Sequence, residues 1–171
     1  MSNQTPHRYL IALGSNRRKL GMVTPQRVIQ GCLQALARDF PLDAISPVRP
    51  SDPLGPSRRR YANAAAILTT PLDPPRLLAE LKAMERQFGR RRGQRWGERV
   101  LDLDIILWSG GTYHSKHLTI PHISFRARAF VLKPAAQIAP AWRDPVTNRT
   151  LRQLASRFLH PKPLDPEPHP F

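Results

Sequence analysis

The sequence predicts a single domain that contains both helices and strands. Its 171 residues, 40% of them hydrophobic, are enough for one domain with a substantial core. Short apolar runs rich in strand-forming residues alternate with segments whose apolar residues recur at helical spacing. No internal repeat or domain linker interrupts this order. We therefore expect one domain over residues 1–160 and a proline-rich, disordered tail over residues 161–171.

The N-terminal part begins with a strand and a helix. Residues 9–13 (Tyr-Leu-Ile-Ala-Leu) predict a short strand that ends at Gly-Ser-Asn. Thr24 and Pro25 are typical of a helix N-cap followed by proline at the first helical position. The apolar face of that helix consists of Val28, Ile29, Cys32, Leu33, Leu36 and Phe40. A second strand is expected over residues 43–48. Prolines and arginines then predict a long irregular loop over residues 49–60.

The rest of the chain follows the same alternation. Residues 61–70 predict a third strand, and residues 74–88 predict a second helix that Gly89 ends. A run of branched apolar residues over 101–107 predicts a buried strand. The remaining expected elements are a hairpin over 112–120, a short helix or turn over 125–132, a short ordered stretch over 134–140 and a last helix over 151–159.

Composition narrows the functional classes. The formal net charge of +15 attracts polyanions, so nucleic acid and a nucleoside triphosphate are both candidate ligands. A third interpretation is a basic, solvated surface that serves solubility. The single cysteine, Cys32, excludes an internal disulfide framework and is typical of a structural thiol in a reducing compartment. No apolar run suits a membrane helix or a signal peptide. We expect a cytoplasmic protein.

The stretch from Arg95 to Leu107 carries the strongest chemical signal. On a strand, Asp102 and Asp104 share one face, about 7 Å apart, while the apolar residues Leu101, Leu103, Ile105 and Leu107 share the other. Two carboxylates on one apolar strand repel each other, and a divalent cation such as Mg²⁺ relieves that repulsion. Solvated or arginine-paired aspartates are the simpler alternative.

The segment before this strand is rich in arginine and glycine. Residues 89–97 contain four arginines, three glycines and a tryptophan. A mobile lid over a polyphosphate and an arginine-rich arm for nucleic acid are both consistent with it, and its position beside the aspartates favours the lid. Glu85 precedes this segment near a helix end, where a carboxylate opposes the helix dipole. Its position suggests a partner, with an exposed glutamate as the alternative.

Four blocks together resemble the 6-hydroxymethyl-7,8-dihydropterin pyrophosphokinase family. The blocks are Leu-Gly-Ser-Asn at 13–16, Pro-Leu-Gly-Pro at 53–56 with Tyr61-x-Asn63, Arg-Trp-Gly-x-Arg-x-x-Asp-Leu-Asp-Ile at 95–105, and Leu-x-Ile-Pro-His at 118–122 with Arg128-x-Phe130. The resemblance covers about residues 8–158. It implies an α+β, ferredoxin-like antiparallel sheet flanked by helices in three α/β/α layers. It also implies transfer of pyrophosphate from ATP to the pterin hydroxymethyl group, which releases AMP.

The resemblance also implies roles for individual residues. Asp102 and Asp104 match the ligands of two Mg²⁺ ions, and the catalytic set is Arg90, Arg92, Arg99, Asp102 and Asp104. The residues that match pterin contacts are Gly14, Pro53, Leu54, Tyr61, Asn63, Trp96 and Phe130. The residues that match ATP contacts are Glu85, Arg92, Trp96, Ile105, Thr119, His122 and Arg128. The implied partners are these two small molecules, and we expect a monomer that binds no specific nucleic acid and no membrane.

Several positions depart from the family pattern and leave alternatives open. Asp52 places a negative charge near the expected pterin pocket, so an enzyme for a related pterin of the methanopterin type is one alternative. His117 and Ile123 replace an arginine and an aromatic residue at the nucleotide end, and Arg91 is able to take the role of Arg90 or Arg92. A basic nucleic-acid-binding module is the alternative from a different class.

Overall fold

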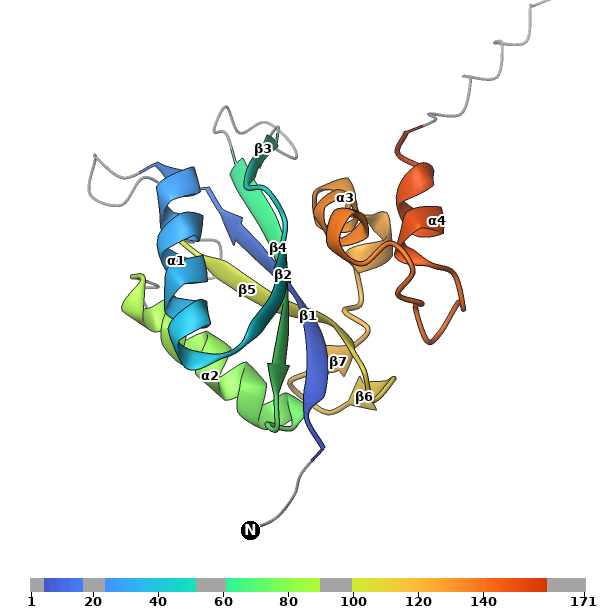
Figure 1. Ribbon diagram of the computed structural model, residues 1–171, viewed down its shortest axis with the longest axis horizontal. Coiled ribbons are helices and arrows are strands. Elements are labelled where there is room, and N and C mark those ends of the chain that lie inside the picture. Colours follow the sequence, from blue (N-terminus) through green and yellow to red (C-terminus); the bar gives the residue numbers. More distant parts are fainter. Residues whose placement is uncertain (1–4, 17–23, 52–60, 90–99, 160–171) are drawn as a thin grey trace, which may run out of the picture.

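The computed structural model describes residues 5–16, 24–51, 61–89 and 100–159, and its centre is an antiparallel sheet (Figure 1). The strands are β1 (His7–Ser15), β2 (Leu42–Ile45), β3 (Arg49–Ser51), β4 (Tyr61–Thr70) and β5 (Asp102–Trp108). Their order is β2-β4-β1-β5, and β3 also pairs with β4. Every pair is antiparallel, as expected from the resemblance.

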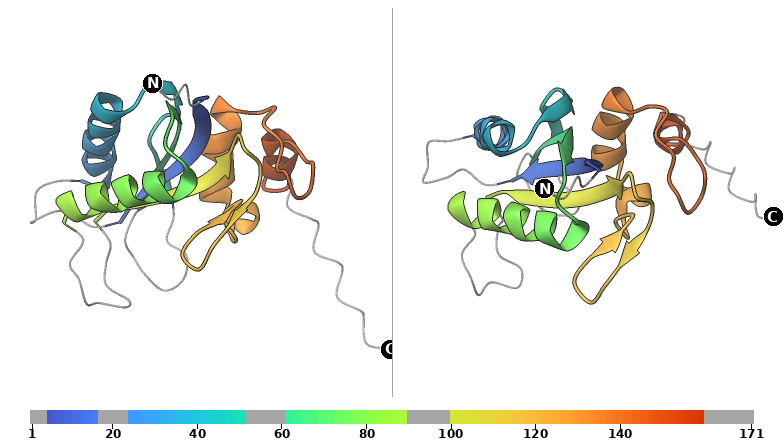
Figure 2. Two further views of the ribbon diagram at one scale, coloured as in Figure 1. Left: turned by 90° about the horizontal axis from the view of Figure 1, so that it is seen from below. Right: turned by 60° about the horizontal axis from the view of Figure 1, so that its bottom comes forward.

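Helices cover both faces of this sheet (Figures 1 and 2). One layer consists of α1 (Pro25–Asp39) and α2 (Pro74–Gln87). The other consists of the short 3₁₀ helix η1 (Phe125–Ala127) with α3 (Ala129–Ile138) and α4 (Leu151–Ser156). A small hairpin, β6 (Tyr113–His114) and β7 (Thr119–Ile120), follows β5. The expected three-layer arrangement is confirmed.

Strand alternation divides the apolar residues into two cores. The first core lies between the sheet and the helices α1 and α2, and includes Ile11, Leu68 and Leu103. The second core lies between the sheet and α3 and α4, and includes Ile67 and Phe125. The strand β4 contributes small alanines to both cores, which lets helices approach the sheet closely on either side.

The helix ends follow the local signals in the sequence. The Thr24 side chain accepts a hydrogen bond from the Arg27 N–H at the start of α1, and Asp73 does the same for Arg76 in α2. Gly89 follows α2 with a φ of +102°, a conformation that glycine adopts without strain. The predicted start of the first helix and the glycine stop of the second are therefore confirmed.

Three expectations about local structure were wrong. Residues 49–51 form the strand β3 rather than loop, because they find partners in Tyr61–Asn63 of β4. The second strand ends at Ile45 rather than at residue 48. Pro134 does not begin a separate stretch but lies inside α3, where it cannot supply the N–H that would bond to the Phe130 carbonyl.

A bulge in β5 corrects a fourth expectation. Leu10 of β1 lies opposite Leu107, whereas Ile11 lies opposite Ile105, so Ile106 is an extra residue in β5. Ile106 and Leu107 therefore both belong to the second core, while Leu103 and Ile105 belong to the first. Leu107 does not share a face with the earlier leucines, but the alternation before the bulge is intact and includes both aspartates.

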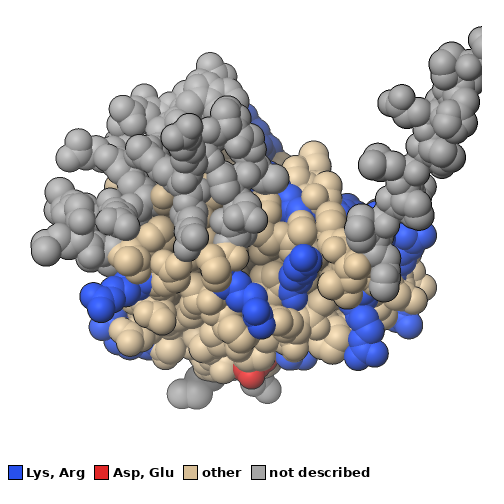
Figure 3. All heavy atoms as spheres, turned by 90° about the horizontal axis from the view of Figure 1, so that it is seen from above, with Lys and Arg blue, Asp and Glu red and all other residues tan. Residues whose placement is uncertain are grey.

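The surface is basic without a single dominant patch in the view we show. Lys and Arg side chains of the described residues occur there as separate groups over the surface (Figure 3). Across the part of the chain that the structure describes, no helix has both the length and the apolar character that crossing a membrane requires.

Candidate active site

Three neighbouring strands place a row of candidate residues on one face of the sheet. Gly14 of β1 lies opposite Asn63 of β4 on one side and opposite Asp102 of β5 on the other. Ala12, two residues earlier in β1, lies opposite Asp104. Because alternate residues of a strand share a face, Tyr61 lies on the same face as Asn63. Residues from three strands that are far apart in the sequence thus form one continuous surface.

Gly14 leaves the centre of this row open. A Cβ atom at this position would lie 3.5 Å from Oδ1 of Asn63. A larger side chain would therefore extend over the backbone between the Asn63 amide and the Asp102 carboxylate. Glycine lets a flat ligand approach the β1 backbone between these two groups.

The two aspartates lie in an unfavourable environment for negative charge. Both are half-buried, and Leu103 between them is fully buried in the first core. Burial raises the pKa of Asp104, and the nearby Asp102 carboxylate raises it further. Positive charges of His122, Lys82 and Arg128 oppose this rise. A bound cation would relieve the remaining cost of keeping both carboxylates ionised.

His122 faces Asp104 from the segment after β7. Its backbone N–H donates to the Ile106 carbonyl at 3.1 Å, which fixes it beside β5. The Ser124 N–H donates to Nδ1 of His122 at 3.3 Å, so Nδ1 is the acceptor and Nε2 carries the proton in the neutral ring. Nε2 lies 3.9 Å from Oδ2 of Asp104. Burial lowers the pKa of His122, although Asp104 opposes this effect.

Arg128 and Phe130 lie at the start of α3. The Arg128 guanidinium carbon is 5.9 Å from the centre of the Phe130 ring, within the range of a cation–π contact. Phe130 is half-buried against the second core, which leaves part of its ring exposed. Tyr61, the other aromatic residue expected at the pterin, is also half-buried and lies at the start of β4.

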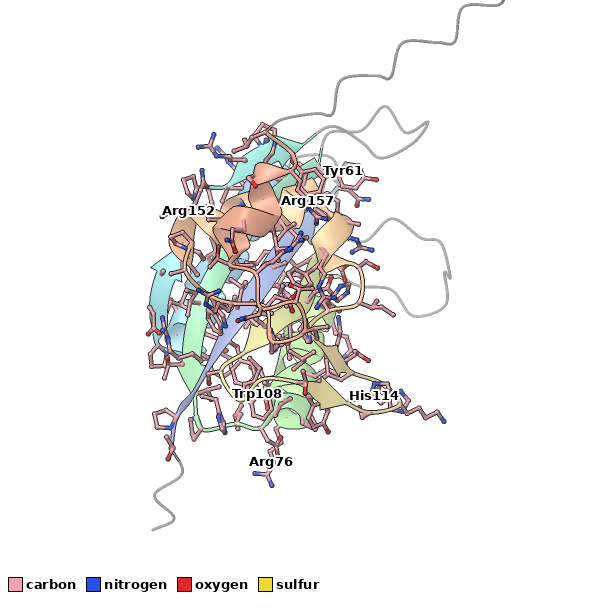
Figure 4. The ribbon with its side chains drawn as sticks, turned by 90° about the vertical axis from the view of Figure 1, so that its right-hand side faces the viewer. Tyr61, Arg76, Trp108, His114, Arg152 and Arg157 are labelled. Carbon is pink, nitrogen blue, oxygen red and sulfur yellow. The ribbon has the colours of Figure 1, made fainter. Side chains whose placement is uncertain are left out.

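The candidate nucleotide contacts extend away from Tyr61. Thr119 of β7 is exposed, and its Oγ1 lies 3.2 Å from Nδ1 of His114. His114 and Tyr61 lie at opposite ends of the molecule (Figure 4). Ile105 is buried in the first core, so only its backbone is available to a ligand.

Glu85 is buried, so the alternative of an exposed glutamate without a partner is wrong. Its side chain has no exposed surface, and its Oε1 accepts hydrogen bonds from the Leu103 N–H at 2.8 Å and from Nζ of Lys82 at 2.6 Å. Sequence reasoning missed Lys82. The spacing of three residues between Lys82 and Glu85 on one helix was the signal that identifies such a pair.

The described residues fit a Mg²⁺ site that also takes ligands from the substrate. Within the described ranges, no group of three or more His, Cys, Asp or Glu side chains could hold a metal ion. Mg²⁺ commonly binds one or two carboxylates and completes its coordination with water and substrate phosphates. Two like-charged carboxylates, one with a raised pKa, are consistent with that pattern.

Part of the predicted site lies outside the described residues. These positions are Asp52, Pro53, Leu54, Arg90, Arg91, Arg92, Trp96 and Arg99, and the expected tail over residues 161–171 lies outside them too. The roles that the resemblance implies for these residues stay predictions. The structure does bring together Gly14, Asn63 and Asp102, and it places His122 beside Asp104.

Comparisons with known proteins identify the family of this chain. Residues 10–140 match the family model described as 7,8-dihydro-6-hydroxymethylpterin-pyrophosphokinase. The chain is 44% identical over 141 residues to the 2-amino-4-hydroxy-6-hydroxymethyldihydropteridine pyrophosphokinase of Pseudomonas aeruginosa, covering 81% of this chain and 84% of that protein. It is 38% identical over 153 residues to the Synechocystis enzyme of the same name, covering 88% of this chain and 76% of that protein.

A solved structure shows the same fold. The crystal structure of wild-type Plasmodium falciparum HPPK-DHPS with SDX-DHP superimposes with a TM-score of 0.72 at 13% identity. The match covers 92% of this chain but 45% of the Plasmodium chain, so this chain spans less than half of that protein.

Proposed function

The chain belongs to the 7,8-dihydro-6-hydroxymethylpterin-pyrophosphokinase family, and from this premise we propose how its residues perform the reaction. The activity is pyrophosphate transfer to hydroxymethyldihydropterin, a step of folate biosynthesis, with ATP as the co-substrate. The row of Asn63, Gly14 and Asp102 on one face of the sheet carries the proposal. It puts an amide that suits a pterin edge next to a carboxylate that suits a metal-bound triphosphate.

Asp102 and Asp104 are the proposed ligands of two Mg²⁺ ions. When bound, Mg²⁺ neutralises the charge of the triphosphate and polarises the phosphoryl group that is transferred. The strand β5 keeps the two carboxylates on one side, and the side chain of Leu103, between them, packs in the first core on the other side. Pyrophosphoryl transfer requires mainly alignment and charge neutralisation, and both fit this arrangement.

The pterin is expected over Gly14. The Asn63 amide offers both a donor and an acceptor, as the edge of a pterin requires. Tyr61 and Phe130 are proposed to stack on the two faces of the ring, with Pro53, Leu54 and Trp96 completing the pocket. Asn63 is only 8% exposed, so the orientation of its amide is restricted by its surroundings.

The nucleotide is expected to extend from Asp104 past His122. The imidazole Nε2–H faces the carboxylate side of the site and can donate to a phosphate oxygen. Arg128 supplies a fork of N–H donors that matches phosphate geometry. Thr119 and the backbone of Ile105 are the proposed contacts further along, with Arg92 and Trp96 as the other predicted ATP residues. Glu85, whose side chain has no exposed surface, is not a direct ATP contact in this proposal. The monomeric state and a cytoplasmic location are further parts of this proposal.

An assay of AMP release tests the function directly. With Mg²⁺, ATP and 6-hydroxymethyl-7,8-dihydropterin, we expect AMP and the pterin diphosphate in equal amounts, and less product from a methylated pterin analogue. Preference for the methylated analogue would instead indicate a methanopterin-type precursor. Absence of AMP, together with RNA affinity that falls steeply with salt, would contradict the enzyme and favour a nucleic-acid-binding module.

Replacing Tyr61 by alanine tests the pterin end of the site. Loss of a stacked aromatic ring costs about 1–3 kcal/mol, which corresponds to a rise in the pterin KM of about 5- to 150-fold. The KM for ATP should change less than about twofold, a margin set by the usual effect of surface substitutions. Tyr61→Phe is the matched control, because it keeps the ring and should keep the wild-type pterin KM. Equal losses for both substrates in Tyr61→Ala would contradict the stacking role.

A further inference from the structure

The outer edge of β5 has no neighbouring strand among the described residues. The strand β5 is the last in the order β2-β4-β1-β5, and β1 is its one partner strand in the main sheet within the described part of the chain. Edge strands present backbone N–H and C=O groups that need other partners. This edge matters for function because it belongs to the strand that carries Asp102 and Asp104.

Two side chains of α2 occupy that edge at Leu103. The Leu103 N–H donates to Oε1 of Glu85 at 2.8 Å, and the Leu103 carbonyl accepts from Nζ of Lys82 at 3.2 Å. The same Lys82 Nζ donates to Oε1 of Glu85 at 2.6 Å. Glu85 therefore supplies an acceptor and Lys82 a donor to the Leu103 backbone, as the backbone of a neighbouring strand would.

Burial makes both hydrogen bonds costly to lose. Leu103 and Glu85 have no exposed surface, and the Lys82 side chain is 29% exposed. A buried backbone group without a partner costs about 1–3 kcal/mol, and a buried carboxylate needs a cation or several donors. The Leu103 peptide groups are thus held firmly in one position by a charged pair.

We propose that Lys82 and Glu85 are positioning residues that fix the Leu103 backbone and thereby hold Asp102 and Asp104 at the separation that binds the metal ions. The inference rests on the proposed function. Leu103 is the residue between the two aspartates, so a shift of its backbone moves both carboxylates. The first core holds only the Leu103 side chain, which leaves its backbone at the open edge to the pair from α2.

The charge of Lys82 and its positioning role predict opposite changes in metal affinity when Lys82 is replaced, so an experiment can tell them apart. The Lys82 ammonium lowers the pKa of Asp104, so its positive charge also disfavours a cation at that carboxylate. If Lys82 acted only through its charge, removing the charge would tighten metal binding. If Lys82 positions the strand, removing its hydrogen bonds loosens Leu103 and weakens metal binding.

The test is the affinity of Lys82→Met for Mn²⁺, measured by titration calorimetry with the non-cleavable α,β-methylene analogue of ATP. We expect affinity about tenfold or more weaker than wild type, because loss of a group that supports metal ligands typically weakens metal affinity by about 10–100-fold. We also expect a lower kcat with an unchanged pterin KM. Lys82→Arg keeps a cationic donor and should restore most of the affinity.

Two controls separate this effect from general destabilisation. Lys133→Met removes an exposed lysine from α3 and should leave the Mn²⁺ affinity unchanged. Val28→Ala destabilises the first core from α1 without touching Leu103, so at a similar loss in Tm it should also keep that affinity. Lys82→Gln is measured as well, so that a neutral variant remains if Lys82→Met does not fold.

Unchanged or tighter Mn²⁺ binding in the neutral Lys82 variants would overturn the inference. That result differs from failure of the proposed function, which would appear as no AMP release from the wild-type protein. The calorimetric comparison requires no catalysis, so the two failures are distinguishable.

Discussion

Replacing Asp104 by asparagine should lower the rate of AMP formation by about a thousandfold or more while the fold stays intact. Asparagine has nearly the same shape but no charge, so it binds Mg²⁺ poorly and cannot balance the charge of the metal ions at the triphosphate. Loss of one preorganised electrostatic group in an active site typically costs about 10²–10³ in kcat, and loss of a metal ligand should cost more. Asp102→Asn should behave in the same way.

The stability of this variant provides a second, independent readout. Burial and the Asp102 carboxylate raise the pKa of Asp104, so the folded state without metal disfavours its ionised form. Above that raised pKa the charge lowers stability, and stability falls as pH rises from the unfolded-state value through the folded-state pKa. In metal-free buffer at neutral pH, the Tm of Asp104→Asn should therefore equal or exceed that of wild type.

Asp43→Asn is the matched control for both measurements. Asp43 lies on β2, where it accepts hydrogen bonds from Arg8 and Thr69, both at 3.0 Å, away from the candidate site. This variant should retain wild-type AMP formation. Full activity in Asp104→Asn, or a large fall in its Tm, would show that Asp104 is a structural residue rather than a metal ligand.

Replacing Asp144 by asparagine should produce the largest loss of stability among simple polar substitutions that we consider. Asp144 is fully buried and accepts hydrogen bonds from Nε and Nη2 of Arg126, both at 2.7 Å, and from the Val146 N–H at 3.1 Å. Removing one partner of a buried pair leaves an uncompensated charge and costs about 3–5 kcal/mol. For a domain of this length, that corresponds to a fall in Tm of roughly 6–20 °C.

The pH dependence of this loss has a definite sign. Burial raises the pKa of Asp144, but hydrogen bonds from Arg126, Thr147 and Val146 outweigh it and lower the pKa from 3.8 to about 2. A lowered folded-state pKa stabilises the protein above 3.8, and that stabilisation, about 2 kcal/mol, disappears as pH falls through about 2. Urea unfolding at pH 6 and pH 3 should therefore show a smaller difference between wild type and Asp144→Asn at pH 3.

The Arg126–Asp144 pair should also affect substrate binding at the candidate site. Arg126 belongs to η1, and Asp144 lies in the connection between α3 and α4. Because Arg128 and Phe130 follow η1 directly, loosening this connection should raise the KM for both substrates modestly in addition to lowering Tm. An equal stability difference at the two pH values would contradict the assigned role of the Asp144 charge.

The sequence alone determined the features that depend on local periodicity. The strand over 61–70 has the predicted bounds, and Thr24 and Gly89 limit helices as expected, because capping and alternation act over a few residues. The same alternation placed Asp102 and Asp104 on one face. The four motif blocks indicated the family, which the comparisons confirm.

The tertiary structure alone decided which distant segments meet. Pairing with β4 makes residues 49–51 a strand, and pairing with β1 creates the bulge that moves Leu107 to the second core. Glu85 and Lys82 gain their partner only where α2 packs against the open edge of β5. Hydrogen bonds and contacts between segments far apart in the chain set these features, and no local pattern of residues encodes them.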